Sequence, residues 1–366
     1  MSRLRTMPDQ PHVTTWRRIA SDECLRNALL RRALILRRIR EWFWARGFIE
    51  VDAPILAPWA GMEPHILPLS TVVTTPSIGR PTALRLYHQT SPEYALKKLL
   101  AAGIPDCFAL GHVFRDGEVS ALHQPEFTLL EWYRRGADYT ALMDDTARVV
   151  ADLATMLGGS PWISYAGASI DLSPPWERVT VAEAMHRWAR VDIEAHPDDE
   201  GFRAHAREQE YAWVTDEPWE DLFYKLFLTH VEPNLGFPRP IILHEYPARF
   251  GALARRHPER PTVVERFEAY VAGVELCNAF SELVDPDEQR RRFAEDRRRQ
   301  VGLGRKPLPA DEDLLEALAA LPPSAGNALG VDRLAMLLLG ERDIARVVWF
   351  PYDLLVAWAA RHEGEA

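Results

Sequence analysis

One segment, residues 266–283, constrains the fold more than any other part of this chain. It reads RFEAYVAGVELCNAFSEL, in which two strand-like runs flank a tight turn at residues 272–273. Two such runs joined by a short turn predict an antiparallel β-hairpin. The hairpin would pair Tyr270 with Glu275 and place Glu268 one diagonal away on the same face.

Two glutamates on one face of this hairpin repel each other unless a cation lies between them. If the segment were helical, the spacing of seven residues would also bring Glu268 and Glu275 onto one face. Mg²⁺ prefers oxygen ligands and often takes one or two carboxylates plus substrate phosphates. Two solvated glutamates on an exposed strand are the alternative. Asn278 and Glu282 continue the polar set, and a buried Glu282 would suit an ammonium group.

Periodicity and capping residues predict the other elements. Ser91 is expected as the N-cap of a helix with Pro92 at its first position, and Asp285 as the N-cap of an arginine-rich helix that ends near Gly302. The region from about 138 to 256 is expected to be mainly helical. Further helices are expected at residues 24–48, 140–157, 181–189 and 222–231, and strands at residues 48–51, 82–90, 108–115, 126–134 and 326–330.

Composition excludes several classes of protein. The 366 residues allow one or two domains, and the net charge of -10 disfavours non-specific binding to nucleic acid. Three scattered cysteines are too few for a disulfide framework or a four-ligand zinc site, so a reducing compartment is expected. No apolar run reaches the ~20 residues of a membrane helix, and the N-terminus lacks the apolar core of a secretory signal.

A first group of candidate functional residues lies between 114 and 133, on the expected strand pair and its polar loop. The guanidinium of Arg115 matches the geometry of phosphate oxygens, and His123 can donate to phosphate as well. Phe127 and Tyr133 offer flat faces to a base or to a cationic amine. The alternative is a strand pair with a solvated loop and aromatic core residues.

A second group is the glycine-rich segment 326–334, which joins a strand to an apolar helix. Small residues at 326, 328 and 330 let a ligand approach the backbone closely. Arg333 lies in the first turn of the helix, where it would stack on a base or hold a phosphate. A simple strand-to-helix connection is the alternative.

Taken in chain order, the segment 114–133, the hairpin 266–283 and the segment 326–334 resemble the core of the class II aminoacyl-tRNA synthetases. The resemblance covers roughly residues 28–350. The signatures at 90–93 (TSPE), 123–128 (HQPEFT), 131–133 (EWY) and 278–283 (NAFSEL) are similar to those of the lysyl branch. The resemblance implies an α+β fold, in which helices flank an antiparallel β-sheet. It also implies a homodimer, because residues 26–54 match the dimer-forming first motif. The expected organisation is an N-terminal extension at 1–25 and a catalytic domain at 26–366, with a helical insertion at about 138–256.

Within that branch the chain resembles the elongation factor P–(R)-β-lysine ligases. Only about 25 residues precede the first core helix, which leaves no room for an anticodon-binding domain, so tRNA is not expected as a partner. The ligases carry Ala-Leu-Gly where the synthetases usually carry Gly-x-Gly, and this chain has Ala328-Leu329-Gly330. The implied enzyme is cytoplasmic, has no membrane partner, and uses ATP and Mg²⁺. It activates (R)-β-lysine or lysine and transfers it to a lysine side chain of elongation factor P.

The resemblance also implies roles for individual residues. Arg115 and Arg333 would be catalytic, and Glu268 and Glu275 would bind Mg²⁺. The residues implied to bind ATP are Arg115, Asp116, Gly117, His123, Gln124, Phe127, Glu275, Leu276, Gly330 and Arg333. Those implied to bind the amino acid are Ser91, Pro92, Glu93, Glu131, Tyr133, Asn278, Glu282 and Ala328.

Some positions depart from the family pattern. Gly117 stands where the second motif usually has glutamate, with Glu118 one place later, and Gln124 and Ala279 replace the usual asparagine and glycine. Two alternatives therefore stay open. One is a stand-alone enzyme that charges tRNA or another small acceptor, and the other is an inactive paralogue that acts as a binding protein.

Overall fold

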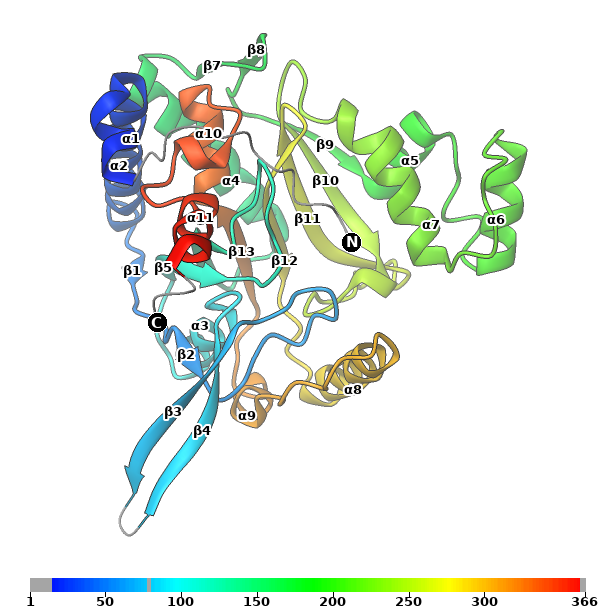
Figure 1. The fold of residues 1–366 in the computed structure, drawn as a ribbon. Coiled ribbons are helices and arrows are strands. Elements are labelled where there is room, and N and C mark those ends of the chain that lie inside the picture. Colours follow the sequence, from blue (N-terminus) through cyan, green and yellow to red (C-terminus); the bar gives the residue numbers. More distant parts are fainter. Residues whose placement is uncertain (1–14, 78–79, 363–366) are drawn as a thin grey trace.

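The computed structural model describes residues 15–77 and 80–362 and is organised around one mixed β-sheet (Figure 1). Six central strands are antiparallel to their neighbours, whereas the two edge strands pair in parallel. The prediction of an α+β fold around an antiparallel core is confirmed. In spatial order the eight strands are β1 (Ile49–Glu50), β5 (Cys107–Phe114), β6 (Glu126–Arg135), β13 (Ser324–Gly330), β12 (Val274–Ser281), β11 (Val263–Val271), β10 (Ile241–Pro247) and β9 (Glu177–Thr180).

The hairpin of β11 and β12 lies near the middle of this sheet. Its turn residues have positive φ, +52° at Ala272 and +74° at Gly273, as the favoured two-residue hairpin turns require. Tyr270 pairs with Glu275, as predicted. The register then shifts, because Leu276 is an extra residue on β12, so that Glu268 lies opposite Asn278. The expectation of an uninterrupted register, with Glu268 one diagonal from Glu275, is therefore wrong.

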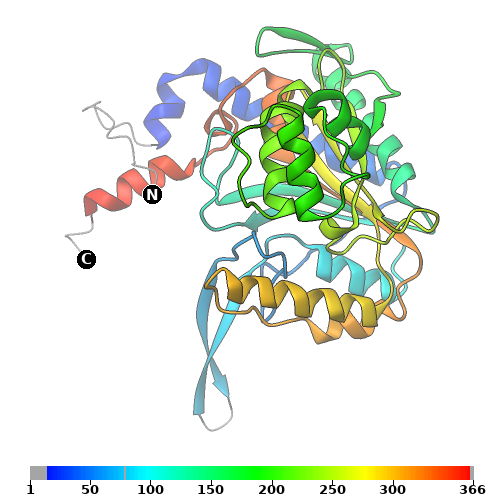
Figure 2. The same cartoon turned by 90° about the vertical axis from the view of Figure 1, so that its right-hand side faces the viewer.

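Helices cover both faces of the sheet (Figures 1 and 2). One face packs against α2, α4 and α10 in the largest apolar core, whereas the other face is covered at one end by α5 and α7 and at the opposite end by α3, α8 and α9. The helices are α1 (Thr15–Ser21), α2 (Glu23–Trp44), α3 (Glu93–Ala101), α4 (Tyr139–Gly158), α5 (Val181–Ala189), α6 (Asp199–Glu208), α7 (Trp219–Leu226), α8 (Pro286–Gly302), α9 (Glu312–Leu318), α10 (Val331–Leu339) and α11 (Tyr352–His362).

Local sequence signals account for several helix ends. The side chain of Asp285 accepts hydrogen bonds from the amides of Asp287 and Glu288, so α8 begins as predicted. The expected start of α3 is one residue too early, because the helix begins at Glu93 and Pro92 is its cap residue. The Ser91 hydroxyl accepts from the Glu93 amide but donates to Glu131, and this contact turns Ser91 toward the interior.

The region 138–256 is not only helical. It also contains a small hairpin, β7 (Trp162–Tyr165) and β8 (Ala168–Asp171), and the two strands β9 and β10 that complete the main sheet. The interpretation of this region as a helical insertion missed these strands. In β10, residues 241–243 are buried on both faces of the sheet, so the sequence there shows no alternation between apolar and polar residues.

A second, smaller sheet projects from the body of the molecule. It consists of β2 (Leu56–Ala57), β4 (Arg80–His88) and β3 (Ser70–Ser77), and its long β3–β4 hairpin extends away from the main sheet in both views (Figures 1 and 2). Among the described residues, no helix is long and apolar enough to cross a membrane.

Candidate active site

A cavity of about 400 Å³ lies on the sheet face that α2, α4 and α10 leave uncovered. Strand alternation determines which side chains line it. On β6, Leu130 and Trp132 point into the apolar core, while Glu131 and Tyr133 line the cavity. On β13, Ala328 lines the cavity in the same way. Residues almost 200 positions apart in the chain therefore share one site.

Most of the predicted site residues meet in this cavity. Pro92, Asp116, Gly117 and Glu282 do not line it, because the first three belong to its surrounding loops and Glu282 is buried beneath it. The predicted residues that line the cavity are Ser91, Glu93, Arg115, His123, Gln124, Phe127, Glu131, Tyr133, Glu268, Glu275, Leu276, Asn278, Ala328, Gly330 and Arg333.

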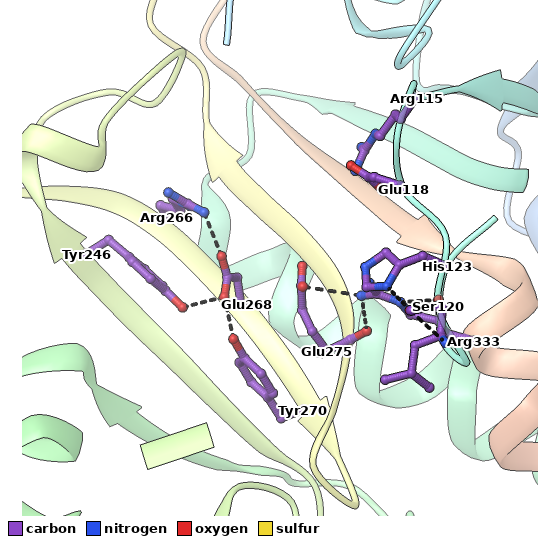
Figure 3. A network of polar contacts seen from close by, with 11 residues as sticks. Arg115, Glu118, Ser120, His123, Tyr246, Arg266, Glu268, Tyr270, Glu275 and Arg333 are labelled. Carbon is purple, nitrogen blue, oxygen red and sulfur yellow. Dashed lines mark hydrogen bonds and ion pairs between the residues drawn. The ribbon is translucent and has the colours of Figure 1, made fainter. Parts of the chain in front are cut away.

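Arg115 follows β5 directly, and its guanidinium lies over the ring of Phe127 at 5.1 Å. Its one ion pair with a described residue is a long contact of 3.9 Å to Glu118 (Figure 3). Its Nε atom is buried and has no hydrogen-bond partner within the described part of the chain. A half-buried guanidinium with an unpaired donor and no close ion pair suits an anionic ligand, and its fork of donors matches a phosphate group.

Arg333 is held in place by Glu275, by His123 and by the carbonyl of Leu122, to which its Nε donates at 3.4 Å (Figure 3). Its Nη1 donates to the carbonyl of Glu275 at 2.9 Å and to the carboxylate of the same residue at 3.2 Å. Its Nη2 lies 2.5 Å from Nε2 of His123. Because a guanidinium only donates, this Nε2 must accept, so the proton of a neutral His123 is on Nδ1 and is donated to the Ser120 hydroxyl at 2.8 Å. Burial and the charge of Arg333 lower the pKa of His123, which agrees with a neutral ring.

Gln124 connects this loop to the last helix. Its side-chain oxygen accepts a hydrogen bond of 2.7 Å from the amide of Tyr352, the first residue of α11. Gly117 lies in the same loop with φ at +78°, a conformation that glycine adopts without strain. Glu118, and not residue 117, is therefore the acidic side chain that this loop presents to the cavity.

The two predicted metal ligands both line the cavity, although the bulge at Leu276 separates them by an extra residue. Glu268 accepts hydrogen bonds of 2.6 Å from Arg266 and from the hydroxyls of Tyr246 and Tyr270 (Figure 3). Burial, assisted by the charge of Glu275, raises the pKa of Glu268.

This donor set fits a hard cation that also binds phosphates. Two carboxylate ligands are what Mg²⁺ takes from a protein when substrate phosphates complete its coordination. Neighbouring donors fix the orientation of Glu268, as outer contacts do in metal sites. No group of three or more potential ligands is placed to hold a metal in the part of the chain that the structure describes, so the remaining ligands would come from the substrate.

The other end of the cavity is strongly acidic. Glu131 accepts hydrogen bonds from the Ser91 hydroxyl and, at 2.8 Å, from the Tyr133 hydroxyl. Burial, assisted by the charge of Glu93, raises the pKa of Glu131 to about 8. A buried carboxylate with only neutral donors is completed by a cationic ligand such as an amine.

Lys97 is a residue of this end that the sequence interpretation missed. Its Nζ atom lies 2.5 Å from carboxylate oxygens of both Glu93 and Glu282. Burial alone would lower the pKa of Lys97, but the two carboxylates outweigh that effect and raise it. The expectation that Glu282 receives a ligand ammonium is therefore incomplete, because an ammonium of the chain itself contacts it. The i, i+4 spacing of Glu93 and Lys97 on a helix was the available signal.

Lys97 is buried beneath the cavity, whereas two other residues missed at the sequence level line it. Arg266 donates to Asn278 at 2.9 Å and to Glu268, so it connects the acidic end to the predicted metal ligands. Glu63 reaches the cavity from the irregular loop that follows β2. The strand pattern around Arg266 indicated its direction, but no local pattern marks Glu63.

Comparisons with known proteins agree with this site. A family model described as "tRNA synthetases class II (D, K and N)" matches residues 13–354. The chain belongs to this family. Two curated relatives, from Enterobacter sp. (strain 638) and Salmonella paratyphi B, are each 38% identical, over 333 and 328 residues. Each alignment covers 89% of this chain and 95% of the relative, and both relatives are named elongation factor P–(R)-β-lysine ligase. The class II synthetase-like chain is thus an ATP-dependent amino-acid ligase that resembles the lysine-transferring members.

Proposed function

We propose that this chain activates (R)-β-lysine, or lysine, with ATP and transfers it to a lysine side chain of elongation factor P. One observation carries the proposal. A single cavity presents two guanidinium groups at one end, Arg115 with a donor unpaired among the described residues and Arg333, and an excess of buried carboxylates at the other. The anionic phosphates of a nucleoside triphosphate match the first end, and the ammonium groups of a diamino acid match the second. The names of the relatives support the same substrate and acceptor.

In the first step a carboxylate oxygen of the amino acid attacks the α-phosphorus of ATP. A new bond joins carboxyl oxygen to phosphorus, and the bond to pyrophosphate breaks, so that pyrophosphate leaves with the electron pair. The nucleophile is already anionic, and no general base is required. Arg115 would hold the α-phosphate and neutralise charge that develops on it, because its guanidinium lies at the cavity wall with a donor unpaired.

In the second step the acceptor amine attacks the carbonyl carbon of the aminoacyl-adenylate. An amide bond forms, the bond between the carbonyl carbon and the phosphate oxygen breaks, and AMP leaves. One proton is lost from the attacking amine to solvent. A protein lysine is a suitable acceptor, because its uncharged amine is a strong nucleophile and forms a stable amide.

We assign the nucleotide to the end of the cavity that Arg115 and Arg333 line. Phe127 and Arg333 would stack on opposite faces of the adenine, with contacts from His123 and Gln124. Glu268 and Glu275 would hold Mg²⁺, which when bound neutralises the phosphates. The loop residues Asp116 and Gly117, together with Leu276 and Gly330, would contact ATP through backbone atoms.

We assign the amino acid to the acidic end. Glu131 would accept the ammonium group farther from the reacting carboxyl, and the Tyr133 hydroxyl would keep this carboxylate oriented. Ala328 faces the cavity opposite Glu131 on the neighbouring strand and would limit its depth. The remaining residues of this end are Ser91, Pro92, Glu93, Asn278 and Glu282.

We further propose a cytoplasmic homodimer. Leu30 and Leu34, one turn apart on α2, are both exposed, and so are Trp44 at the end of that helix and Ile49 on β1. A row of exposed apolar residues along one helix is typical of a protein interface. Size-exclusion chromatography with light scattering tests this: a Leu30→Glu, Leu34→Glu variant should be monomeric if α2 forms the interface.

Mass spectrometry of the acceptor tests the function directly. Purified elongation factor P, incubated with the chain, ATP and (R)-β-lysine, should gain the mass of one lysyl group, and no gain should occur without ATP. ATP–pyrophosphate exchange without the acceptor should follow the same amino acid. If the chain catalyses ATP–pyrophosphate exchange and charges tRNA, but elongation factor P gains no mass, the proposed acceptor is wrong. No exchange with any amino acid would favour an inactive binding protein.

A further inference from the structure

Glu63 is a cavity residue to which neither the family motifs nor the proposed reaction gives a role. It lies in the loop between β2 and β3, outside every signature described above. Its Oε2 atom is buried and has no hydrogen-bond partner within residues 15–77 and 80–362. Gly61 makes room for this carboxylate, because a Cβ at that position would lie 2.6 Å from Oε2 of Glu63. The loop therefore places the Glu63 carboxylate at the cavity wall and supplies no donor for its buried Oε2 atom.

A count of charges at the acidic end shows what is missing. Four carboxylates gather there, those of Glu63, Glu93, Glu131 and Glu282. The one ammonium group, that of Lys97, is shared between Glu93 and Glu282. Glu131 has only hydroxyl donors, and Glu63 has no ion pair with a described residue. Two carboxylates are left without a cation, and a diamino acid carries two ammonium groups.

The positions of these two carboxylates differ along the cavity. The loop that carries Glu63 pairs with the segment that follows Arg115, where the amino-acid carboxyl would react, because the amide of Asp116 donates to the carbonyl of Leu67 at 2.7 Å. Glu131 instead accepts a hydrogen bond from Ser91, two residues before Glu93, and the carboxylate of Glu93 contacts Lys97. Glu63 is thus the carboxylate nearer the reacting end, and Glu131 is the one nearer the buried lysine.

We propose that Glu63 binds the amine that lies nearer the substrate's carboxyl group, and so takes part in the choice between α- and β-amino acids. This inference rests on the proposed function. The two substrates differ only in the proximal amine. The distal ammonium is the same number of carbons from the carboxyl group in lysine and in β-lysine, whereas the proximal amine moves by one carbon. A carboxylate on a loop close to Arg115 discriminates between these two positions, and one at Glu131 does not.

The ionisation behaviour of Glu63 agrees with a ligand site. Burial, followed by the charge of Glu93, raises the pKa of Glu63 to about 7. An ammonium group bound beside this carboxylate would favour its charged form. The same carboxylate without a ligand keeps an uncompensated charge or takes up a proton, either of which is unfavourable in a buried position.

Equilibrium binding of three compounds to the full chain tests the proposal. The compounds are (R)-β-lysine, L-lysine and 6-aminohexanoate, which keeps the carboxyl and the distal amine but lacks the proximal one. Affinities are measured by calorimetry in the presence of a non-hydrolysable ATP analogue, with weak binders measured by competition. Glu63→Gln should weaken the two diamino acids by about 10- to 100-fold, the cost of one charged hydrogen bond. It should leave the affinities for 6-aminohexanoate and for the ATP analogue unchanged.

Asp296→Asn is the matched control. Asp296 lies on α8, acts electrostatically on Glu63, and lines a different cavity. An equal loss of diamino-acid affinity in Asp296→Asn would show a general field effect and overturn the proposal. So would an equal loss for 6-aminohexanoate in Glu63→Gln. If Glu63→Gln does not fold, Glu63→Asp serves instead, and it must change the ratio of the β-lysine and lysine affinities.

The affinity measurements do not involve elongation factor P, so the Glu63 proposal and the proposed function can fail separately. If wild-type chain binds diamino acids but does not modify elongation factor P, the proposed function fails in its second half while the Glu63 comparison still gives an answer. If it modifies the factor and Glu63→Gln shows no selective loss, the Glu63 proposal fails and the function stands. Wild-type chain that binds neither diamino acid would overturn both.

Discussion

The Nζ atom of Lys97 lies 2.5 Å from Oε2 of Glu282 beneath the cavity, with only 1% and 0% of the two side chains exposed. Glu93 contacts the same ammonium from the preceding turn of α3. This ion pair joins α3, which begins with the glutamate of the serine–proline–glutamate signature, to the residue directly after β12, the strand that carries the predicted metal ligand Glu275. The acidic end of the site is therefore assembled around a cation of the chain itself.

Removal of that cation should destabilise the fold. In Lys97→Met two buried carboxylates lose their partner, and breaking a buried ion pair from one side costs about 3–5 kcal/mol. Urea unfolding followed by circular dichroism should show this loss in the free energy of unfolding. In the double variant Lys97→Met, Glu282→Gln much of the loss should be recovered, because one uncompensated charge is gone. Equal stability of the single variant and the wild type would contradict the structural role assigned here.

The elements with strong local signals were predictable from the sequence. The β11–β12 turn, the strand pair β5–β6 and the capped start of α8 each depend on residues adjacent in the chain, so pattern and capping rules reach them. The candidate site was predictable to the same extent, because its motifs lie on these elements. Arg115 and Glu131, for example, were assigned to the site from such motifs, and both line the cavity, while their roles stay predictions.

What could not be predicted depends on contacts between distant segments. The contact of Lys97 with Glu282 joins positions 185 residues apart, and no local pattern encodes it. The bulge at Leu276 changes the register without a glycine or proline to mark it. Residues 241–243 of β10 are apolar on both faces, because an apolar core packs against each side of the sheet there. Their sequence pattern is therefore like that of a buried helix.

Arg115 provides a test of the adenylation step. Arg115→Gln keeps much of the side-chain volume but removes the charge that would neutralise the α-phosphate. We expect the rate of ATP–pyrophosphate exchange to fall by about 10²- to 10³-fold, the usual effect of losing one preorganised donor to a developing charge. Arg37→Gln on the exposed face of α2 is the control and should exchange at the wild-type rate. If both variants have wild-type rates, Arg115 does not act on the phosphate.

Gly326 lies where the acidic end is most tightly packed. A Cβ at this position would lie 2.3 Å from a ring carbon of Tyr133 and 2.7 Å from Oε1 of Glu282. Gly326→Ala should therefore lower the free energy of unfolding by about 1–3 kcal/mol and raise KM for the amino acid, because Tyr133 must shift. Gly111→Ala on β5, where a Cβ would have no atom within 4 Å, is the matched control in thermal unfolding. A loss of similar size in both variants would mean that packing at Tyr133 is not the cause.

The raised pKa of Glu131 predicts how stability changes with pH. Burial raises the pKa of this carboxyl from its usual 4.5 to about 8, so between these values the folded chain binds more protons than the unfolded chain. The free energy of unfolding should then decrease as the pH rises from about 5 to about 8. Carboxyls with lowered pKa, such as that of Asp285, act in the opposite direction but below this range.

Urea unfolding between pH 5 and pH 9 measures this dependence, and Glu131→Gln isolates it. The substituted amide cannot ionise, so the variant should lose part of the decrease and become more stable than the wild type near pH 9. Glu177→Gln is the control, because Glu177 lies exposed on the edge strand β9. Its unfolding curve should follow the wild type at every pH. Parallel curves for Glu131→Gln and the wild type would show that Glu131 carries no raised pKa, and the demand of the acidic end for a cationic ligand would lose its basis.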